Sequence, residues 1–107
     1  MTTKDPRSAC PVAYLLDILG DRWTMLVIRD LLLGASKHKD FLASPEGIPT
    51  NILAERLKRL EGEGLVSKTA YQDNPVRYTY VLTTKGRDLA PLLKEMVKWS
   101  KKYRDDV

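Results

Sequence analysis

The stretch SKHKDFLASPEGIPTNILAERLKRLEGE, residues 36–63, decides the fold that this sequence predicts. Its beginning predicts a short helix over residues 36–42 with Ser36 as the N-cap, because a serine oxygen accepts a hydrogen bond from a free backbone amide. Residues 44–47 form a turn by composition, and the apolar spacing that follows predicts a second helix over about residues 50–63. A short helix joined by a tight turn to a charged amphipathic helix is the helix-turn-helix arrangement.

The segment LVSKTAYQDNPVRYTYVL, residues 65–82, follows directly and predicts a β-hairpin. Residues 65–71 and 78–82 are rich in residue types of β character, and the loop between them contains the turn-forming sequence Asp-Asn-Pro. A hairpin directly after a helix-turn-helix indicates a winged helix-turn-helix. The helix pair is then residues 36–63, and the wing is residues 65–83.

Two helices are predicted before this motif. Pro11 suits the first position of a helix, and the apolar spacing extends that helix over residues 12–19. Gly20 ends it, and Asp21 is a suitable N-cap for a second helix over about residues 22–33. This second helix is apolar on most sides, so we expect it at the centre of the core.

A last long helix is expected over residues 85–103, capped by Thr83 or Thr84. Its apolar residues recur at helical spacing, and this stripe either completes the core of the monomer or forms a twofold interface with the first helix. We expect the interface, because the stripe extends beyond the length that so small a domain needs to cover. The predicted interface residues are Tyr14, Leu15, Ile18, Leu92, Leu93, Met96, Trp99 and Tyr103.

The predicted fold class is mainly α with a small β-hairpin. It is a single winged helix-turn-helix domain over residues 1–107, with a flexible lead-in at residues 1–9 and dimerisation helices at residues 10–20 and 85–104. A length of 107 residues with 43% hydrophobic and 30% charged residues suits one soluble globular domain. The sequence has neither a run of about 20 apolar residues nor an apolar signal segment, so we expect a cytoplasmic protein without a membrane partner.

The scarcity of cysteine and histidine excludes several kinds of site. One cysteine excludes an internal disulfide framework and a cysteine metal cage, and His38 is the single histidine. The sequence offers no nucleophile–base pair and no glycine-rich loop to bind phosphate. We therefore expect neither an enzyme nor a metal or cofactor site.

The charge of the chain leaves its partner open. A net charge of +4 and a pI of about 9.3 are typical of proteins that bind nucleic acid. The largest excess is in residues 84–107, which carry seven basic and four acidic groups. A lysine-rich solvated helix would also account for that excess.

An ordered set of residues runs from Cys10 to about Trp99. It comprises Cys10-Pro11, the sequence LGDRWT at residues 19–24, Phe41, Ile48 with Leu53, Arg56-Leu57-Lys58, Leu60-Glu61, Gly64-Leu65-Val66, Tyr71, Pro75-Val76, Tyr80, Leu82-Thr83, Lys85-Gly86, Leu89 and Trp99. In this set the chain resembles the HxlR-type winged-helix transcriptional regulators of bacteria, which are relatives of the MarR-like regulators. The resemblance implies a homodimer that binds operator DNA and represses or activates nearby genes.

Two positions depart from that family. Pro49 stands where the family usually has serine, so Thr50 is expected to cap the second helix of the motif instead. Asp21 and Arg22 stand where the family commonly has a Gly-Lys pair, and Arg22 keeps a basic side chain there.

The second helix of the motif predicts which residues read DNA. Leu53, Leu57 and Leu60 share its buried face, and the N-terminal turns of such a helix read bases in the major groove. Asparagine pairs with adenine, glutamate accepts from cytosine, alanine contacts the thymine methyl group, and cations bind phosphate. The predicted contacts to double-stranded DNA are Thr50, Asn51, Ala54, Glu55, Arg56 and Lys58 on this helix, Lys37, His38 and Lys39 at the start of the preceding helix, and Asn74 and Arg77 in the wing.

Two alternatives stay open at this point. The charged side of the helix could be an ordinary solvated face, and the domain could be a protein-interaction module without sequence-specific DNA binding. A titration against promoter DNA at several salt concentrations separates these interpretations.

Cys10 precedes Pro11 and is therefore predicted at the N-cap of the first helix. The free amides and the positive end of the helix dipole stabilise a thiolate there, and Lys4 and Arg7 add to the effect. The resemblance implies a sensing role, because some HxlR-type regulators sense oxidants, quinones or aldehydes through a cysteine at this position. The alternatives are a redox sensor that answers a small-molecule or electrophile effector, and a thiol that merely packs against the helix.

Overall fold

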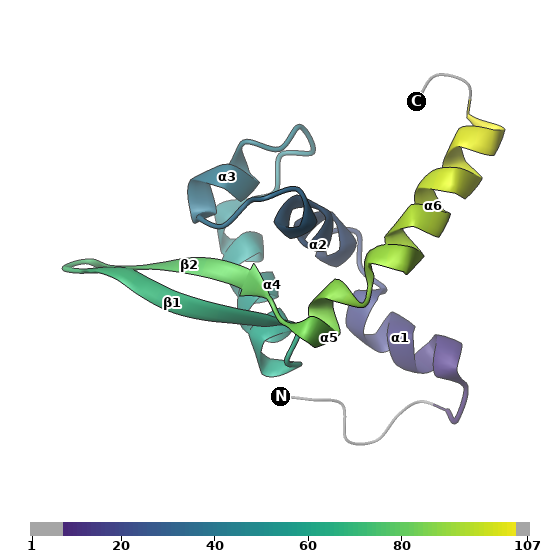
Figure 1. The fold of residues 1–107 in the computed structure, drawn as a ribbon, viewed down its shortest axis with the longest axis horizontal. Helices are drawn as coiled ribbons and strands as arrows, with labels where there is room; N and C mark the ends of the chain where they lie inside the picture. The colour runs from purple at the N-terminus through teal and green to yellow at the C-terminus, as the bar shows by residue number, and fades with distance from the viewer. Residues whose placement is uncertain (1–7, 105–107) are drawn as a thin grey trace.

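The computed structural model of the protein describes residues 8–104, so residues 1–7 of the predicted lead-in lie outside it. The predicted order of elements is confirmed, with six helices and one antiparallel hairpin in this part of the chain (Figure 1). In chain order the elements are α1 (Pro11–Leu19), α2 (Thr24–Leu32), α3 (His38–Leu42), α4 (Thr50–Gly62), β1 (Val66–Asp73), β2 (Val76–Leu82), α5 (Thr84–Arg87) and α6 (Ala90–Tyr103).

Helix α2 is the centre of the core, as its apolar sequence predicts. It contacts α1, α3, α4, α6 and β2 (Figure 1). Ile28 of α2, Phe41 of α3 and Leu53 of α4 are fully buried together. Removing these large side chains from water supplies the main force that holds the helix-turn-helix together. None of the helices within residues 8–104 is long and apolar enough to cross a membrane.

The wing lies within the predicted residues 65–83, but its two strands extend further towards the tip than the sequence predicts. Strands β1 and β2 pair from Val66 with Leu82 out to Asp73 with Val76, and one bulge lies between Ala70 and Gln72. The amide of Tyr80 donates to the carbonyl of Ser36 over 2.8 Å, so the segment before α3 lies along the edge of β2. The hairpin therefore projects from the body of the protein beside the helix-turn-helix (Figure 1).

The prediction of one continuous C-terminal helix is wrong, because two helices, α5 and α6, form there. Pro91 has no amide hydrogen to donate to the carbonyl of Arg87, so a continuous helix would lose a hydrogen bond there. The predicted cap at Thr83 is present, since its hydroxyl oxygen accepts from the amide of Gly86 over 3.1 Å. A Cβ atom on Gly86 would lie 2.2 Å from the carbonyl oxygen of Leu65, so this close packing requires glycine.

Three predicted N-caps are also corrected. Lys37 occupies the N-cap of α3 in place of Ser36, and the Asp40 carboxylate accepts from both of their amides over 2.9 and 3.0 Å. Pro49 occupies the N-cap of α4, so Thr50 is the first residue of that helix. Helix α2 begins at Thr24 instead of residue 22, because Asp21 stabilises the preceding turn through its side chain.

Candidate nucleic-acid interface

Helix α4 separates a buried face from an exposed polar face. Leu53, Leu57 and Leu60 are almost completely buried against the core. The predicted DNA contacts Thr50, Asn51, Ala54, Glu55 and Lys58 are all exposed. The N-terminal turns of this helix therefore present hydrogen-bonding groups to solvent from a backbone that the core holds rigidly.

The start of α3 lies against the wing. The Lys37 ammonium group is 4.5 Å from the centre of the Tyr71 ring, and the His38 ring is 5.8 Å from the Tyr80 ring. Lys39 is exposed. The structure thus brings two predicted phosphate-binding residues of α3 next to the hairpin, although they are far from it in the sequence.

The tip of the wing carries the remaining predicted contacts. Asn74 lies in the two-residue turn and is exposed. Arg77 is also exposed, but it belongs to strand β2, where it is paired with Gln72. A groove of about 330 Å³ lies between the wing and α3, and its lining includes Arg77 and His38.

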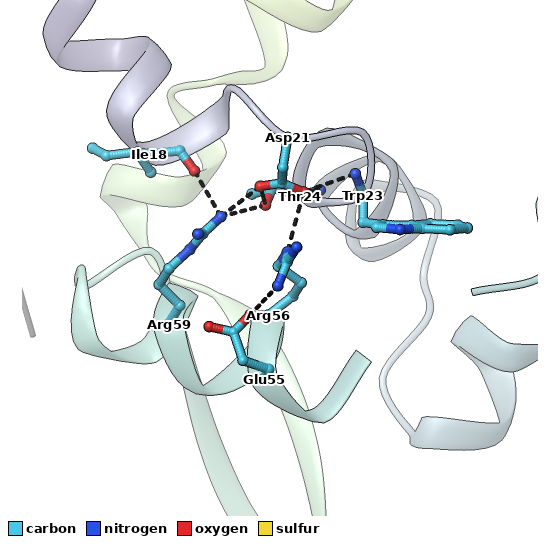
Figure 2. Close-up of polar contacts among 7 residues, drawn as sticks. All are labelled: Ile18, Asp21, Trp23, Thr24, Glu55, Arg56 and Arg59. Carbon is cyan, nitrogen blue, oxygen red and sulfur yellow. Dashed lines mark hydrogen bonds and ion pairs between the residues drawn. The ribbon is translucent and has the colours of Figure 1, made fainter. Parts of the chain in front are cut away.

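A set of polar side chains ties α4 to the N-terminal half of the protein, and Figure 2 shows it from close by. We call it the Asp21 cluster; its members are Ile18, Asp21, Trp23, Thr24, Glu55, Arg56 and Arg59. One carboxylate oxygen of Asp21 accepts from the amides of Trp23 and Thr24 over 2.8 and 2.9 Å. The other oxygen accepts from the hydroxyl group of Thr24. Asp21 therefore holds the turn between α1 and α2 in place.

The same carboxylate binds two arginines of α4. Arg56 donates through Nε to Asp21 over 3.1 Å, and Arg59 donates through Nη2 to the other carboxylate oxygen over 2.5 Å (Figure 2). Arg59 Nη2 also donates to the hydroxyl oxygen of Thr24 over 2.8 Å and to the carbonyl of Ile18 over 3.2 Å. The orientation of α4 relative to α1 and α2 is thus maintained by ion pairs as well as by the core.

The electrostatics of this cluster favour the charged form of Asp21. Partial burial opposes ionisation, but hydrogen bonds from Thr24, Trp23 and Arg56 outweigh burial and hold the pKa of Asp21 well below its usual range. Burial likewise opposes the charge of Arg56, yet its bonds to Asp21 and Glu55 raise its pKa. The cluster therefore stays ionised at neutral pH.

The sequence reasoning did not find this cluster. It treated Asp21 as a helix cap and placed Arg56 towards the DNA backbone, whereas the guanidinium of Arg56 is directed to Asp21 and Glu55. Arg59 was not assigned any role. Two features of the sequence could have indicated the cluster. One is the acidic Asp21 where the family commonly has glycine, and the other is the pair Arg56 and Arg59, three positions apart on one helix.

Helix α6 leaves an apolar stripe without cover. No residue of α6 is buried, and Met96, Trp99 and Tyr103 are 46%, 67% and 63% exposed. Leu92 and Leu93 are partly buried, and Leu92 packs against the core. The predicted interface on this helix is therefore largely accessible to a partner.

Helix α1 contributes fewer of its predicted interface residues. Tyr14 is half exposed and Leu15 is partly buried, but Ile18 is only 6% exposed because it lies on the face that packs against the core. Ile18 is thus unavailable to a partner. Val12 and Leu16 are exposed apolar residues of α1 that the sequence reasoning missed.

Cys10 occupies the predicted N-cap of α1, and its side chain is exposed. Hydrogen bonds from the amides of Ala13 and Val12 lower the pKa of the thiol. Lys4 and Arg7, which were expected to add to this effect, lie outside the described residues. Within residues 8–104, no three histidine, cysteine, aspartate or glutamate residues are grouped so that they could hold a metal ion.

Comparison with known proteins identifies the family. The family model for HxlR-like helix-turn-helix proteins matches residues 18–107 of the chain. This protein belongs to the HxlR-like helix-turn-helix family. The resemblance noted in the sequence is therefore confirmed.

One curated protein and two solved structures are similar to this HxlR-like protein over most of their length. YvaP of Bacillus subtilis (strain 168), an uncharacterized HTH-type transcriptional regulator, is 40% identical over 90 residues, which cover 84% of this chain and 83% of YvaP. The reduced form of the transcriptional regulator YodB, from the same species, has a TM-score of 0.73 at 32% identity and covers 94% of this chain and 99% of YodB. The redox regulator HypR in its reduced form has a TM-score of 0.80 at 29% identity and covers 90% of this chain and 95% of HypR.

These comparisons settle the class of the protein. The curated relatives of this HxlR-like protein are helix-turn-helix transcriptional regulators, so it is a transcriptional regulator and not an enzyme. Its winged-helix architecture agrees with that of the solved structures it resembles.

Proposed function

We propose that this HxlR-like protein binds a pseudo-palindromic operator as a homodimer and recognises the base sequence of that operator. It thereby regulates transcription. The observation that carries the proposal is the exposed N-terminal face of α4, whose opposite face is buried in the core. A helix that is held rigidly on one side and presents polar groups on the other can enter the major groove and read base edges.

Each exposed residue of α4 has a role that its chemistry suits. Asn51 can pair with adenine, Glu55 can accept from cytosine, and Ala54 can contact a thymine methyl group. Thr50 can bond to a base or a phosphate. Lys58 lies one turn further along the helix and suits a phosphate contact.

The residues around α4 complete the proposed contact surface. Lys37, His38 and Lys39 lie where the first helix of such a motif crosses the DNA backbone. Asn74 and Arg77 at the tip of the wing suit the minor groove or a neighbouring phosphate. Arg56 is assigned a positioning role here, because its guanidinium is already bound to Asp21.

The proposed dimer uses the uncovered stripe of α6, represented by Trp99 and Tyr103, together with the exposed side of α1 around Tyr14. Apolar side chains of this size are rarely left in water over four helical turns of a monomer. A twofold dimer would place two α4 helices about one DNA turn apart, roughly 34–36 Å, as two half-sites of an operator require.

We also propose that Cys10 makes this regulator responsive to oxidants or electrophiles. Its thiol is exposed and its pKa is lowered, so a reactive thiolate is more populated than at an ordinary cysteine. HypR is described as a redox regulator, and YodB has been crystallised after diamide treatment. Since the chain holds one cysteine, a disulfide would join Cys10 to the partner's Cys10 or to a small thiol.

The experiment that tests the proposed function is a titration of the protein against DNA from its own promoter and against random DNA, at several salt concentrations. Tighter binding to promoter DNA, with affinity that falls steeply as salt rises, supports it. Equal binding to the two DNAs down to low salt would contradict it. The domain would then fit a protein-interaction module better.

A further inference from the structure

We propose that Asp21 is a specificity-determining residue, because it holds the guanidinium groups of Arg56 and Arg59 away from DNA phosphates. This inference rests on the proposed DNA binding by α4 and concerns how that helix limits its affinity for DNA of any sequence. Contacts to phosphates increase affinity without reading bases, so a regulator that needs specificity benefits from keeping them few.

The three cations of α4 are not equivalent. Lys58 is exposed, and among residues 8–104 no acidic side chain is paired with it. Arg56 and Arg59 both donate to the Asp21 carboxylate, at 3.1 and 2.5 Å. Two of the three cations on the DNA-facing helix are thus paired with one acidic residue from outside it.

Arg59 shows most clearly that Asp21 redirects a side chain. At 100° per residue, Arg59 lies about 80° around the helix from Asn51, on the outward side and well away from Leu57. Its guanidinium nevertheless points back to Asp21, Thr24 and the carbonyl of Ile18 (Figure 2). Without the negative charge of Asp21, Arg59 would keep two neutral acceptors and could swing towards solvent.

Arg56 is held twice and is therefore expected to remain in place. It pairs with Glu55 of the same helix as well as with Asp21. Its side chain is only 17% exposed, compared with 31% for Arg59. Loss of the Asp21 charge should consequently release one arginine, Arg59, to reach a phosphate.

The quantity that measures this release is the dependence of DNA affinity on salt. Each phosphate that a protein cation neutralises makes the slope of log K against log salt steeper by about 0.9 on duplex DNA. A contribution of Asp21 to folding alone would leave this slope unchanged.

The test compares Asp21→Asn with Asp88→Asn, both as full-length proteins, on promoter DNA and on random duplex DNA. Both variants raise the net charge by the same amount, but Asp88 is exposed and lies outside the helix-turn-helix. We expect Asp21→Asn to bind random DNA more tightly, with a slope steeper by about one, and to lose part of its preference for the promoter. Asp88→Asn should retain both the slope and the preference of the wild type.

The variant Arg59→Gln tests the same idea without altering Asp21. Since Arg59 is already held away from DNA, its loss should leave the slope on random DNA unchanged, whereas Lys58→Gln should reduce it by about one. The double variant Asp21→Asn with Arg59→Gln should restore the slope of the wild type.

Two results would overturn the inference. One is a slope for Asp21→Asn that equals the slope for Asp88→Asn. The other is a slope for Arg59→Gln that falls by about one, which would mean that Arg59 contacts a phosphate in the wild type. If Asp21→Asn does not fold, the salt slope of Arg59→Gln on random DNA tests the inference by itself. Failure of the proposed function looks different, because the wild type would then show no preference for the promoter.

Discussion

Arg59 of α4 donates a hydrogen bond from Nη2 to the main-chain oxygen of Ile18, at 3.2 Å, and so joins α4 directly to the last turn of α1. Cys10 occupies the N-cap position at the other end of the same nine-residue helix, about 12 Å away along its axis. The helix that carries the thiol and the helix proposed to read DNA are therefore in direct contact through one side chain.

Asn51 is predicted to read a base, so Asn51→Ala should weaken binding to the operator by about 1–3 kcal/mol and leave binding to random DNA nearly unchanged. The reason is that a side chain which bonds to a base edge contributes only where that base is present. Binding isotherms on the two DNAs measure both quantities. Lys58→Ala is the control, since it should weaken both affinities alike and reduce the salt slope by about one. An equal loss on both DNAs for Asn51→Ala would remove Asn51 from the base-reading residues.

Trp99 is predicted to lie in the dimer interface, so Trp99→Glu should yield monomers that bind the operator weakly. A carboxylate at the centre of an apolar interface would lose its hydration without gaining a partner. Sedimentation measures the oligomeric state, and circular dichroism checks that the monomer stays folded. Lys94→Gln, on the opposite side of α6, also lowers the net charge by one and should remain dimeric. A dimeric Trp99→Glu protein would place the interface elsewhere.

Cys10 is predicted to mediate a response to oxidants, so diamide or a quinone should change the operator affinity of the wild type and leave that of Cys10→Ser unchanged. Serine keeps the size of the side chain and can still cap α1, but it cannot be oxidised or alkylated in the same way. Operator titrations before and after treatment measure the response. If both proteins respond equally, or neither responds, Cys10 is structural and any effector acts at another site.

Asp21 should also make the stability of the protein depend on pH. Its pKa is lowered in the folded state from an ordinary value of about 3.9, so its stabilising effect is complete above about pH 4 and is lost as the pH falls towards the folded pKa. Asp21→Asn should be less stable by about 1–3 kcal/mol at pH 7. Its stability should also fall less steeply than that of the wild type between pH 4 and pH 2.

Urea unfolding at a series of pH values measures both effects. The variant should retain some acid sensitivity, because bonding to Arg29 also lowers the pKa of Glu46, to about 2. Asp88→Asn should follow the wild type closely. Parallel curves for the wild type and Asp21→Asn would show that Asp21 contributes no pH-dependent stability.

Most of the architecture could be predicted because its determinants are local. The spacing of Leu53, Leu57 and Leu60 identifies the buried face of α4 and, with it, the exposed side that carries Asn51. The position of Cys10 at a helix N-cap follows from the adjacent Pro11. The break before α6 was missed because the prediction followed the apolar spacing, which continues past it, although Pro91 lies in the interior of the predicted helix and signals a break.

The sequence by itself thus determined the order of helices and hairpin, the outward face of α4 and the place of Cys10. The tertiary structure decided where Arg56 and Arg59 point, since their partner Asp21 lies 35 and 38 residues away. It also decided that Ile18 is buried in the core while Trp99 is not. The physical reason is that helical periodicity and capping depend on neighbouring residues, whereas ion pairs and burial depend on which elements the folded chain brings together.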